Sequence, residues 1–250
     1  MKMPRQARQK SSTGIYHVIL RGINQQQIFE EDEDNIKYLQ TLAEYKAISE
    51  YKLLAYCLMG NHIHLLIKEE KEELVQIFKR IGGKFVYWYN GKYGRIGHLF
   101  QDRFKSEPIE TDSYLLTVLR YIHQNPLKAG IVKDISKYEW SSYSDYLNQK
   151  SELTDIEFIN EMIGKNEFIE FHKAENDDKC IEISDIQFRL TDEQAKKLIE
   201  KISQCDNATE FQKLDIKKRD NALKKLKKKG LSIRQISRLT GVSFAIVRKS

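Results

Sequence analysis

Residues 51–69, YKLLAYCLMGNHIHLLIKE, decide the fold that we predict for this chain. Two apolar runs of strand composition, 51–59 and 62–69, lie on either side of Gly60-Asn61. A glycine–asparagine pair between two such runs favours a tight hairpin turn. We therefore predict two adjacent antiparallel strands in this part of the chain.

The segments around this hairpin complete an α+β pattern. In chain order they are the strand 16–23, the helix 31–50, the helix 72–94, the strand 103–110 and the helix 112–125. We expect the second helix to loosen at Gly82-Gly83 and the third to stop at Pro126. The order strand–helix–strand–strand–helix–strand is the ferredoxin-like βαββαβ pattern, here with the third helix appended.

The charge is unevenly distributed along the sequence. Residues 1–150 contain 22 Lys and Arg against 18 Asp and Glu, residues 151–210 contain 7 against 16, and residues 211–250 contain 13 against 2. A basic tail of this kind is typical of a segment that binds a polyanion. We predict a first domain over 1–150, an acidic linker or helical connector over 151–189, and an all-α basic domain over 190–250.

The last twenty residues, LSIRQISRLTGVSFAIVRKS (231–250), have a helix-turn-helix pattern with Gly241 at the turn. The residues expected to pack inward are Ile233, Ile236, Leu239, Val242, Ala245 and Ile246. The residues expected to face outward and to contact phosphates or base edges are Arg234, Gln235, Ser243, Arg248 and Lys249. A helical hairpin that serves only for packing is the alternative.

His62 and His64 lie on one face of the strand predicted over 62–69, because successive side chains of a strand point to opposite faces. Two imidazoles placed in this way are within reach of one divalent ion. The alternative for an isolated pair is that both histidines hydrogen-bond to neighbouring groups. A third ligand or a nearby nucleophile would favour the metal site.

The stretch LRYIHQNP (119–126) offers both. On a helix, Tyr121 and Asn125 face the same way, and an amide oxygen is a suitable third ligand for Mg²⁺ or Mn²⁺. Gln124 is the alternative ligand, since Pro126 disfavours helical geometry at the preceding residue. Tyr121 is either a nucleophile, helped by a metal that stabilises charge on a phosphate, or an ordinary core residue.

Three motifs together resemble the HUH single-tyrosine transposases, especially their REP-associated branch. They are GNHIHLLI (60–67), GHLFQDRFKSEPIE (97–110) and YLLTVLRYIHQNPLKAGIV (114–132). HUH denotes two histidines around one hydrophobic residue, here His62-Ile63-His64. The resemblance covers residues 10–147.

This resemblance implies a ferredoxin-like nuclease that acts on single-stranded DNA, often at ends that carry a hairpin. His62 and His64 are then metal ligands, Tyr121 is the nucleophile, and Asn125 takes the place of the third, amide-bearing ligand. Attack by the tyrosine leaves a 5′-phosphotyrosine and a free 3′-hydroxyl, which can attack another such link and rejoin strands. Arg103, in the second motif, is expected to contact a DNA phosphate.

The basic end of the chain resembles the helical DNA-binding module of bacterial replication initiators, which implies recognition of a duplex or a hairpin. Two other functions stay open. One is a domesticated, non-catalytic regulator that binds DNA through these helices. The other is a nucleotide phosphoesterase with a histidine nucleophile, which would leave the basic tail unexplained. A homodimer is compatible with each of them.

Composition also bears on the location of the protein. No apolar stretch approaches the roughly 20 residues that span a bilayer, and no secretory signal pattern is present near the start. Cys57, Cys180 and Cys205 are scattered and form no CxxC pair. We therefore expect a bacterial protein in a reducing cytoplasm, associated with the nucleoid and not with a membrane.

Overall fold

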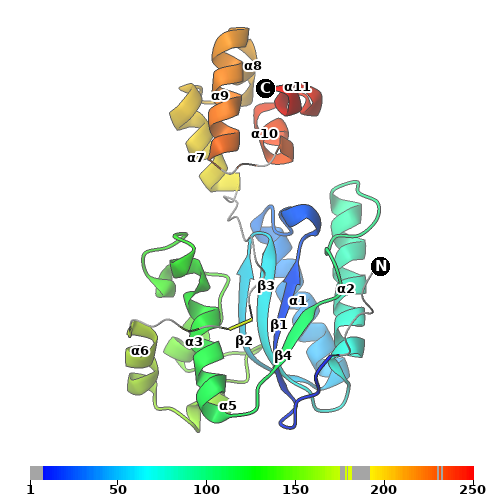
Figure 1. Cartoon of the computed structure of the whole chain (residues 1–250), viewed down its shortest axis with the longest axis vertical. Coiled ribbons are helices and arrows are strands. Elements are labelled where there is room, and N and C mark those ends of the chain that lie inside the picture. The colour runs from blue at the N-terminus through cyan, green and yellow to red at the C-terminus, as the bar shows by residue number, and fades with distance from the viewer. Residues whose placement is uncertain (1–7, 175–177, 179, 182–191, 230, 232) are drawn as a thin grey trace, which may run out of the picture.

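The hairpin predicted at Gly60-Asn61 is present and lies in a four-stranded antiparallel sheet of order β2-β3-β1-β4 (Figure 1). The structure is a computed structural model that describes residues 8–174, 178, 180–181, 192–229, 231 and 233–250. The strands are β1 (Ile15–Arg21), β2 (Lys52–Met59), β3 (His62–Lys68) and β4 (Lys105–Pro108). The helices between and after them are α1 (Asp32–Ser49), α2 (Leu74–Lys92) and α3 (Asp112–Lys128). This order confirms the predicted α+β, ferredoxin-like class.

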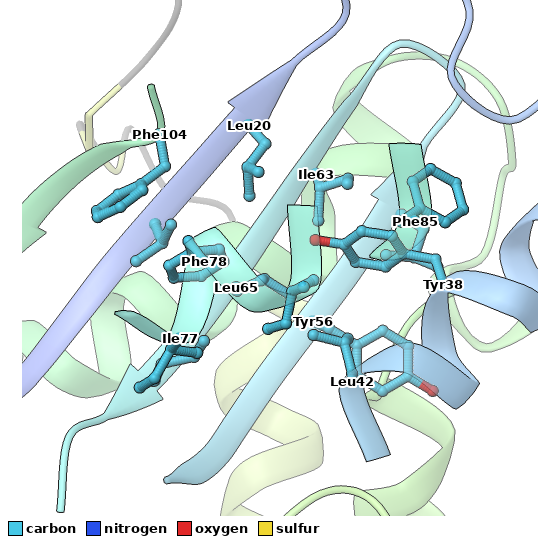
Figure 2. Close-up of a cluster of buried hydrophobic side chains, with 14 of the residues drawn as sticks. Leu20, Tyr38, Leu42, Tyr56, Ile63, Leu65, Ile77, Phe78, Phe85 and Phe104 are labelled. Atoms are coloured by element: carbon cyan, nitrogen blue, oxygen red, sulfur yellow. The ribbon is translucent and has the colours of Figure 1, made fainter. Parts of the chain in front are cut away.

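One face of the sheet is covered by α1 and α2. Ile63 and Leu65 of β3 point toward these helices and pack against Tyr38 of α1 and Phe78 and Phe85 of α2 (Figure 2). Because side chains alternate along a strand, the histidines at 62 and 64 point to the opposite face. This buried apolar layer therefore sets which side of the sheet receives the polar residues.

The opposite face of the sheet is covered by α3. Leu54 and Leu66 of the sheet pack in one hydrophobic cluster with Val118 and Ile122 of α3. Figure 1 shows α3 on the side of the sheet away from α2. The sheet is thus buried on both faces, and its second face carries polar side chains into a second core.

Two predicted interruptions of helices are wrong. The helix α2 runs without a break through Gly82-Gly83, and α3 continues beyond Pro126 to Lys128. A proline removes one backbone donor and crowds the preceding turn. At Pro126 only the last turn of α3 is affected. The buried residues between Leu115 and Pro126 hold the helix against the sheet. Tertiary packing outweighs local preference here.

Three short helices extend the second core. They are α4 (Tyr143–Asn148), α5 (Ile156–Asn160) and α6 (Lys165–Lys173), and two 3₁₀ turns, η1 (Ile23–Gln25) and η2 (Ile135–Lys137), connect other elements. Ile156, Ile159 and Phe168 belong to the same cluster as Leu119 and Ile122. The predicted connector 151–189 therefore contains α5 and α6, which pack on the first domain, and its residues 175–177, 179 and 182–189 lie outside the described ranges.

The carboxy-terminal residues form a separate group of helices with their own core (Figure 1). They are α7 (Asp192–Ser203), α8 (Ala208–Lys213), α9 (Ile216–Lys228), α10 (Ile233–Thr240) and α11 (Phe244–Lys249). Gly241 between the last two has φ of +67°, a conformation that glycine adopts at little cost. Within the described ranges, no helix is long and apolar enough to cross a bilayer.

Three expected orientations in the last two helices are wrong. Gln235 is buried with 1% of its surface exposed, and it donates a hydrogen bond to Asp192 at 3.0 Å. Its position follows from the helical period, because Ile236 and Thr240 are buried beside it on the inward face. Ala245 and Ile246 are exposed, and Val247 fills the core instead because α11 begins only at Phe244. The other residues expected to face outward in these helices are exposed, namely Arg234, Ser243, Arg248 and Lys249.

The two buried tyrosines Tyr38 and Tyr51 give opposite expectations for removal of a hydroxyl. The Tyr51 hydroxyl donates to the Leu42 carbonyl at 2.7 Å, whereas the fully buried Tyr38 hydroxyl has no hydrogen-bond partner within the described residues. We expect Tyr51→Phe to lower the free energy of unfolding by about 1 kcal/mol and Tyr38→Phe to leave it unchanged or raise it by up to about 1 kcal/mol. Urea denaturation measures both, and equal losses would contradict the expectation.

Candidate active site

The two histidines of the HxH motif are fully buried on the face of the sheet that α3 covers. The ring centroids of His62 and His64 are 4.9 Å apart, and the ring of His64 lies 5.7 Å from that of Tyr121. The sheet therefore provides the imidazoles and α3 provides the phenol. Residues almost sixty positions apart meet because α3 crosses this face of the sheet.

Tyr121 lies near the middle of α3 with 2% of its surface exposed. The ammonium group of Lys128, two helical turns further on, is 5.2 Å from the centre of the Tyr121 ring. A cation at this distance from an aromatic face is attracted to it. The surroundings of Tyr121 thus combine the imidazoles of His17 and His64 with the positive charge of Lys128.

The two amides considered as a third ligand have different partners. The amide nitrogen of Gln124 donates to the backbone carbonyl of His172 in α6 at 2.7 Å. The amide nitrogen of Asn125 donates to the backbone carbonyl of Tyr121 at 2.8 Å, one turn earlier in the same helix. Gln124 is therefore directed toward α6, while Asn125 stays beside Tyr121. The assignment of Asn125 as a ligand remains a prediction.

His17 on β1 belongs to this site, although we did not predict it from the sequence. Its Nε2 lies 3.0 Å from Nδ1 of His64, and its ring is 5.8 Å from the Tyr121 ring. The signal was present in the strand YHVILR, since position 17 falls on the same strand face as positions 19 and 21. A lone histidine in a strand did not by itself indicate a site.

Arg21 is a second residue that sequence reasoning missed. It pairs directly with His62 across β1 and β3, so a guanidinium group lies next to this imidazole. Burial, together with the charge of Arg21, lowers the pKa of His62 to about 3. The positive charge next to the histidine is suited to a ligand that carries negative charge, such as a phosphate.

All three histidines on this sheet face are neutral at pH 7. Burial holds the pKa of His64 well below its ordinary value, and the neighbouring His62 and His17 act in the same direction. Burial also lowers the pKa of His17, although Glu107 opposes this shift. A neutral imidazole has one nitrogen with a free lone pair, which is the form that binds a metal ion.

The residues present fit a divalent metal ion. Nε2 of His64 is buried and, among the residues that the structure describes, it has no hydrogen-bond partner. A buried nitrogen without a partner costs free energy unless a ligand occupies its lone pair. Within the same residues, no three His, Cys, Asp or Glu converge on one point. Two imidazoles, an amide oxygen and oxygens of a substrate would therefore supply the ligands.

A second pair of buried histidines has a purely structural arrangement. Nδ1 of His172 donates to the Phe168 carbonyl at 2.8 Å, so its Nε2 accepts from Nδ1 of His123 at 3.0 Å. Nε2 of His123 is then the acceptor for the Ser142 hydroxyl at 2.9 Å. Every imidazole nitrogen in this chain of hydrogen bonds has a partner, which leaves no lone pair for a ligand.

Arg103 is exposed and lies just before β4. The guanidinium of Arg8 stacks 3.8 Å above the ring of Phe104, the next residue. Burial lowers the pKa of Arg8, and the nearby charge of Arg103 lowers it further. The positive charges of Arg8 and Arg103 therefore act on each other at this end of the sheet, which suits an anionic partner.

Residues 10–125 match the model of the family described as IS200-like transposases. The matched segment runs from the residues before β1 through α3 and includes the HxH motif, Tyr121 and Asn125. The first domain belongs to the IS200-like transposase family. This assignment confirms the resemblance to single-tyrosine transposases. The helices beyond α3 lie outside the match, so the resemblance of the basic end to a replication-initiator module stays a prediction.

Two solved structures are similar to this chain. One is a REP-associated tyrosine transposase bound to a REP hairpin, with 18% identity, a TM-score of 0.49, and coverage of 62% of this chain and 94% of that chain. The other is a protein from Deinococcus radiodurans assigned as a transposase, with 18% identity, a TM-score of 0.34, and coverage of 50% and 97%. None of the curated proteins compared with this chain matches it significantly.

Acidification should destabilise the folded protein through its buried histidines. His17, His62, His64, His123 and His172 are all buried, and burial lowers the pKa of each. The unfolded chain protonates these groups near pH 6.5, so between pH 6.5 and 5 it binds more protons than the folded chain. We expect the free energy of unfolding to fall through this range by up to about 1.4 kcal/mol per pH unit for each histidine.

Urea denaturation at pH 7, 6 and 5 gives the slope of this dependence. Removal of one buried group, as in His123→Gln, should make the slope shallower, while the exposed His98→Gln serves as the control. A stability that is constant from pH 7 to 5 would show that these histidines are protonated in the folded state.

Proposed function

We propose that this protein is a metal-dependent transposase that cleaves and rejoins single-stranded DNA through a covalent 5′-phosphotyrosine at Tyr121. Membership of the transposase family supports the reaction class. The contact between the rings of His64 and Tyr121, 5.7 Å apart, is the observation that carries the assignment of roles. It brings a candidate nucleophile next to a candidate metal ligand.

In the proposed reaction, the Tyr121 oxygen forms a bond to a DNA phosphorus and the 3′-oxygen of the preceding nucleotide leaves. The phenol of Tyr121 loses its proton, and the leaving 3′-oxygen gains a proton. Lys128 favours the phenolate electrostatically from its place beside the ring. A divalent ion, Mg²⁺ or Mn²⁺, held by His62, His64 and Asn125 would stabilise negative charge on the phosphate oxygens.

The same covalent bond stores the energy of the cleaved phosphodiester. A free 3′-hydroxyl of another strand can attack the phosphotyrosine, which restores the phenol and joins two DNA segments. No external energy source is needed for this exchange. Cleavage and rejoining therefore use one site and one nucleophile.

In the proposal, the basic helices bind the duplex stem of a hairpin while the transposase domain holds the adjoining single strand. Arg234, Ser243, Arg248 and Lys249 are exposed on α10 and α11 or at the turn between them, where they can contact phosphates and base edges. Arg103 would contact a phosphate of the single strand. A protein with these partners acts at the bacterial nucleoid in the cytoplasm.

One observation favours a second candidate function, that of a non-catalytic DNA-binding regulator. Tyr121 exposes 2% of its surface, and His62 and His64 expose none. A phosphate cannot reach Tyr121 in this arrangement, so catalysis requires local opening around α3. A regulator that binds DNA only through the basic helices needs no such opening.

Tyr121→Phe should abolish the covalent adduct, because the variant lacks the oxygen that attacks the phosphate. The measurement is a denaturing gel of the full chain incubated with labelled single-stranded hairpin oligonucleotides and Mn²⁺. The exposed Tyr87→Phe is the matched control and should form the adduct as the wild type does. His62→Ala should lose cleavage while it retains most of the DNA binding.

The outcomes separate the candidate functions. An adduct in Tyr121→Phe would exclude this tyrosine as the nucleophile, and an acid-labile phosphohistidine would indicate the phosphoesterase alternative. Hairpin binding by the wild type without cleavage under any metal condition would support the regulator.

The double variant Arg248→Gln/Lys249→Gln should bind hairpin DNA more weakly and with less dependence on salt. Each contact between a cation and a phosphate contributes about −0.9 to the slope of log affinity against log salt for duplex DNA. Two lost contacts should reduce that slope by roughly 1.8. Fluorescence anisotropy at several salt concentrations measures it, with exposed Lys79→Gln/Lys165→Gln as the charge-matched control. An unchanged slope would exclude α11 from the DNA interface.

A further inference from the structure

Three side chains form a row across neighbouring strands on the face of the sheet that α3 covers. His17 of β1 pairs directly with Glu107 of β4. On its other side, His17 pairs with Leu66 of β3, so His64, two residues earlier on β3, is diagonal to His17. Residues related in this way share one face of the sheet. The row Glu107–His17–His64 therefore follows from the register of β4, β1 and β3.

The contacts within the row join polar side chains. Nε2 of His17 lies 3.0 Å from Nδ1 of His64, and Nδ1 of His17 lies 3.8 Å from a carboxylate oxygen of Glu107. The same carboxylate oxygen accepts a hydrogen bond from the backbone N–H of Ile181 at 3.1 Å. Both imidazoles are fully buried, whereas 29% of the Glu107 side chain is exposed.

The position of the protons in this row decides whether His64 can bind a metal. A hydrogen bond between two neutral imidazoles has one donor and one acceptor, so two arrangements exist. If His17 donates from Nε2, then Nε2 of His64 carries a proton and has no free lone pair. If His64 donates from Nδ1, then Nε2 of His64 has a free lone pair, and Nδ1 of His17 carries the remaining proton.

Glu107 selects between the two arrangements. Although burial raises its pKa, contacts with His17, the Ile181 N–H and Tyr114 hold the pKa of Glu107 below its ordinary value, so it is a carboxylate at pH 7. At 3.8 Å the carboxylate is beyond hydrogen-bond distance of Nδ1 of His17, but its negative charge still favours the proton on this nitrogen, which faces it. The second arrangement is then the stable one.

We propose that His17, itself oriented by Glu107, is a positioning residue that holds His64 in the tautomer and orientation that a metal ligand requires. The role rests on the proposed function, because it presumes a divalent ion at His64. Outer partners of this kind fix the ring and increase the basicity of metal-binding histidines. His17 would thereby influence the reaction without contacting the phosphate.

The binding of Mn²⁺ by the full chain without DNA tests this role. Loss of the hydrogen-bond acceptor in His17→Leu should weaken Mn²⁺ binding by about 10–100-fold, as measured by the electron paramagnetic resonance signal of free Mn²⁺. His17→Gln should restore most of the affinity, because its side-chain oxygen can accept the proton of His64 Nδ1. His172→Leu is the matched control, since it removes a buried histidine with two hydrogen bonds on α6.

Long-range ¹H–¹⁵N spectra of the metal-free protein provide a second readout that does not depend on affinity. We expect the proton of His64 on Nδ1 in the wild type and a shift of population toward Nε2 in Glu107→Gln, whose amide can donate to His17. Glu107 is partly exposed, with 29% of its side chain accessible, so this variant is expected to fold. A wild-type His64 protonated on Nε2 would overturn the proposal.

The results also distinguish this proposal from the one on which it rests. If the wild type binds Mn²⁺ and His17→Leu binds it with equal affinity, the role of His17 is overturned and the metal site remains. Failure of the wild type to bind Mn²⁺ would overturn both. Weakened binding in His17→Leu and in His172→Leu to the same degree would show a general loss of structure and would also overturn the role of His17.

Discussion

The packing of α3 across one face of the sheet is the constraint on which the rest of this structure depends. The sheet already has one apolar face, which α1 and α2 bury through residues such as Ile63 and Leu65. The other face alternates with it and therefore contains His17, His62 and His64 in place of a continuous apolar surface. The helix α3 covers these histidines and brings Tyr121 into contact with His17 and His64.

This packing requires that polar groups be buried, and their hydrogen bonds make that possible. Buried imidazoles are stable when they are neutral and when their nitrogens have partners. His123 and His172 meet this condition completely through Ser142 and the Phe168 carbonyl. His64 meets it at one nitrogen only. The His123–His172 pair is therefore a structural chain of hydrogen bonds, whereas His64, which contacts His17, has one nitrogen that can bind a ligand.

The closed state of the site and the separate basic helices indicate how the two parts of the chain divide the work in the proposed function. The helices α7 to α11 have their own core and need no contact with Tyr121 to present Arg248 and Lys249 to solvent. Tyr121 is 2% exposed, so the proposed reaction requires α3 or its surroundings to move. Binding of a hairpin by exposed cations can therefore precede the opening that brings a phosphate to the tyrosine.

The sequence by itself determined the order of strands and helices, the single face shared by His62 and His64, and the family motifs around Tyr121. These follow from local periodicity and turn chemistry, which act over a few residues. Tertiary structure decided that α3 continues past Pro126, that Gln235 and Val247 face inward, and that His17 and Glu107 join the site. Those outcomes depend on strand register and on the burial of whole faces, which bring together residues that no local pattern connects.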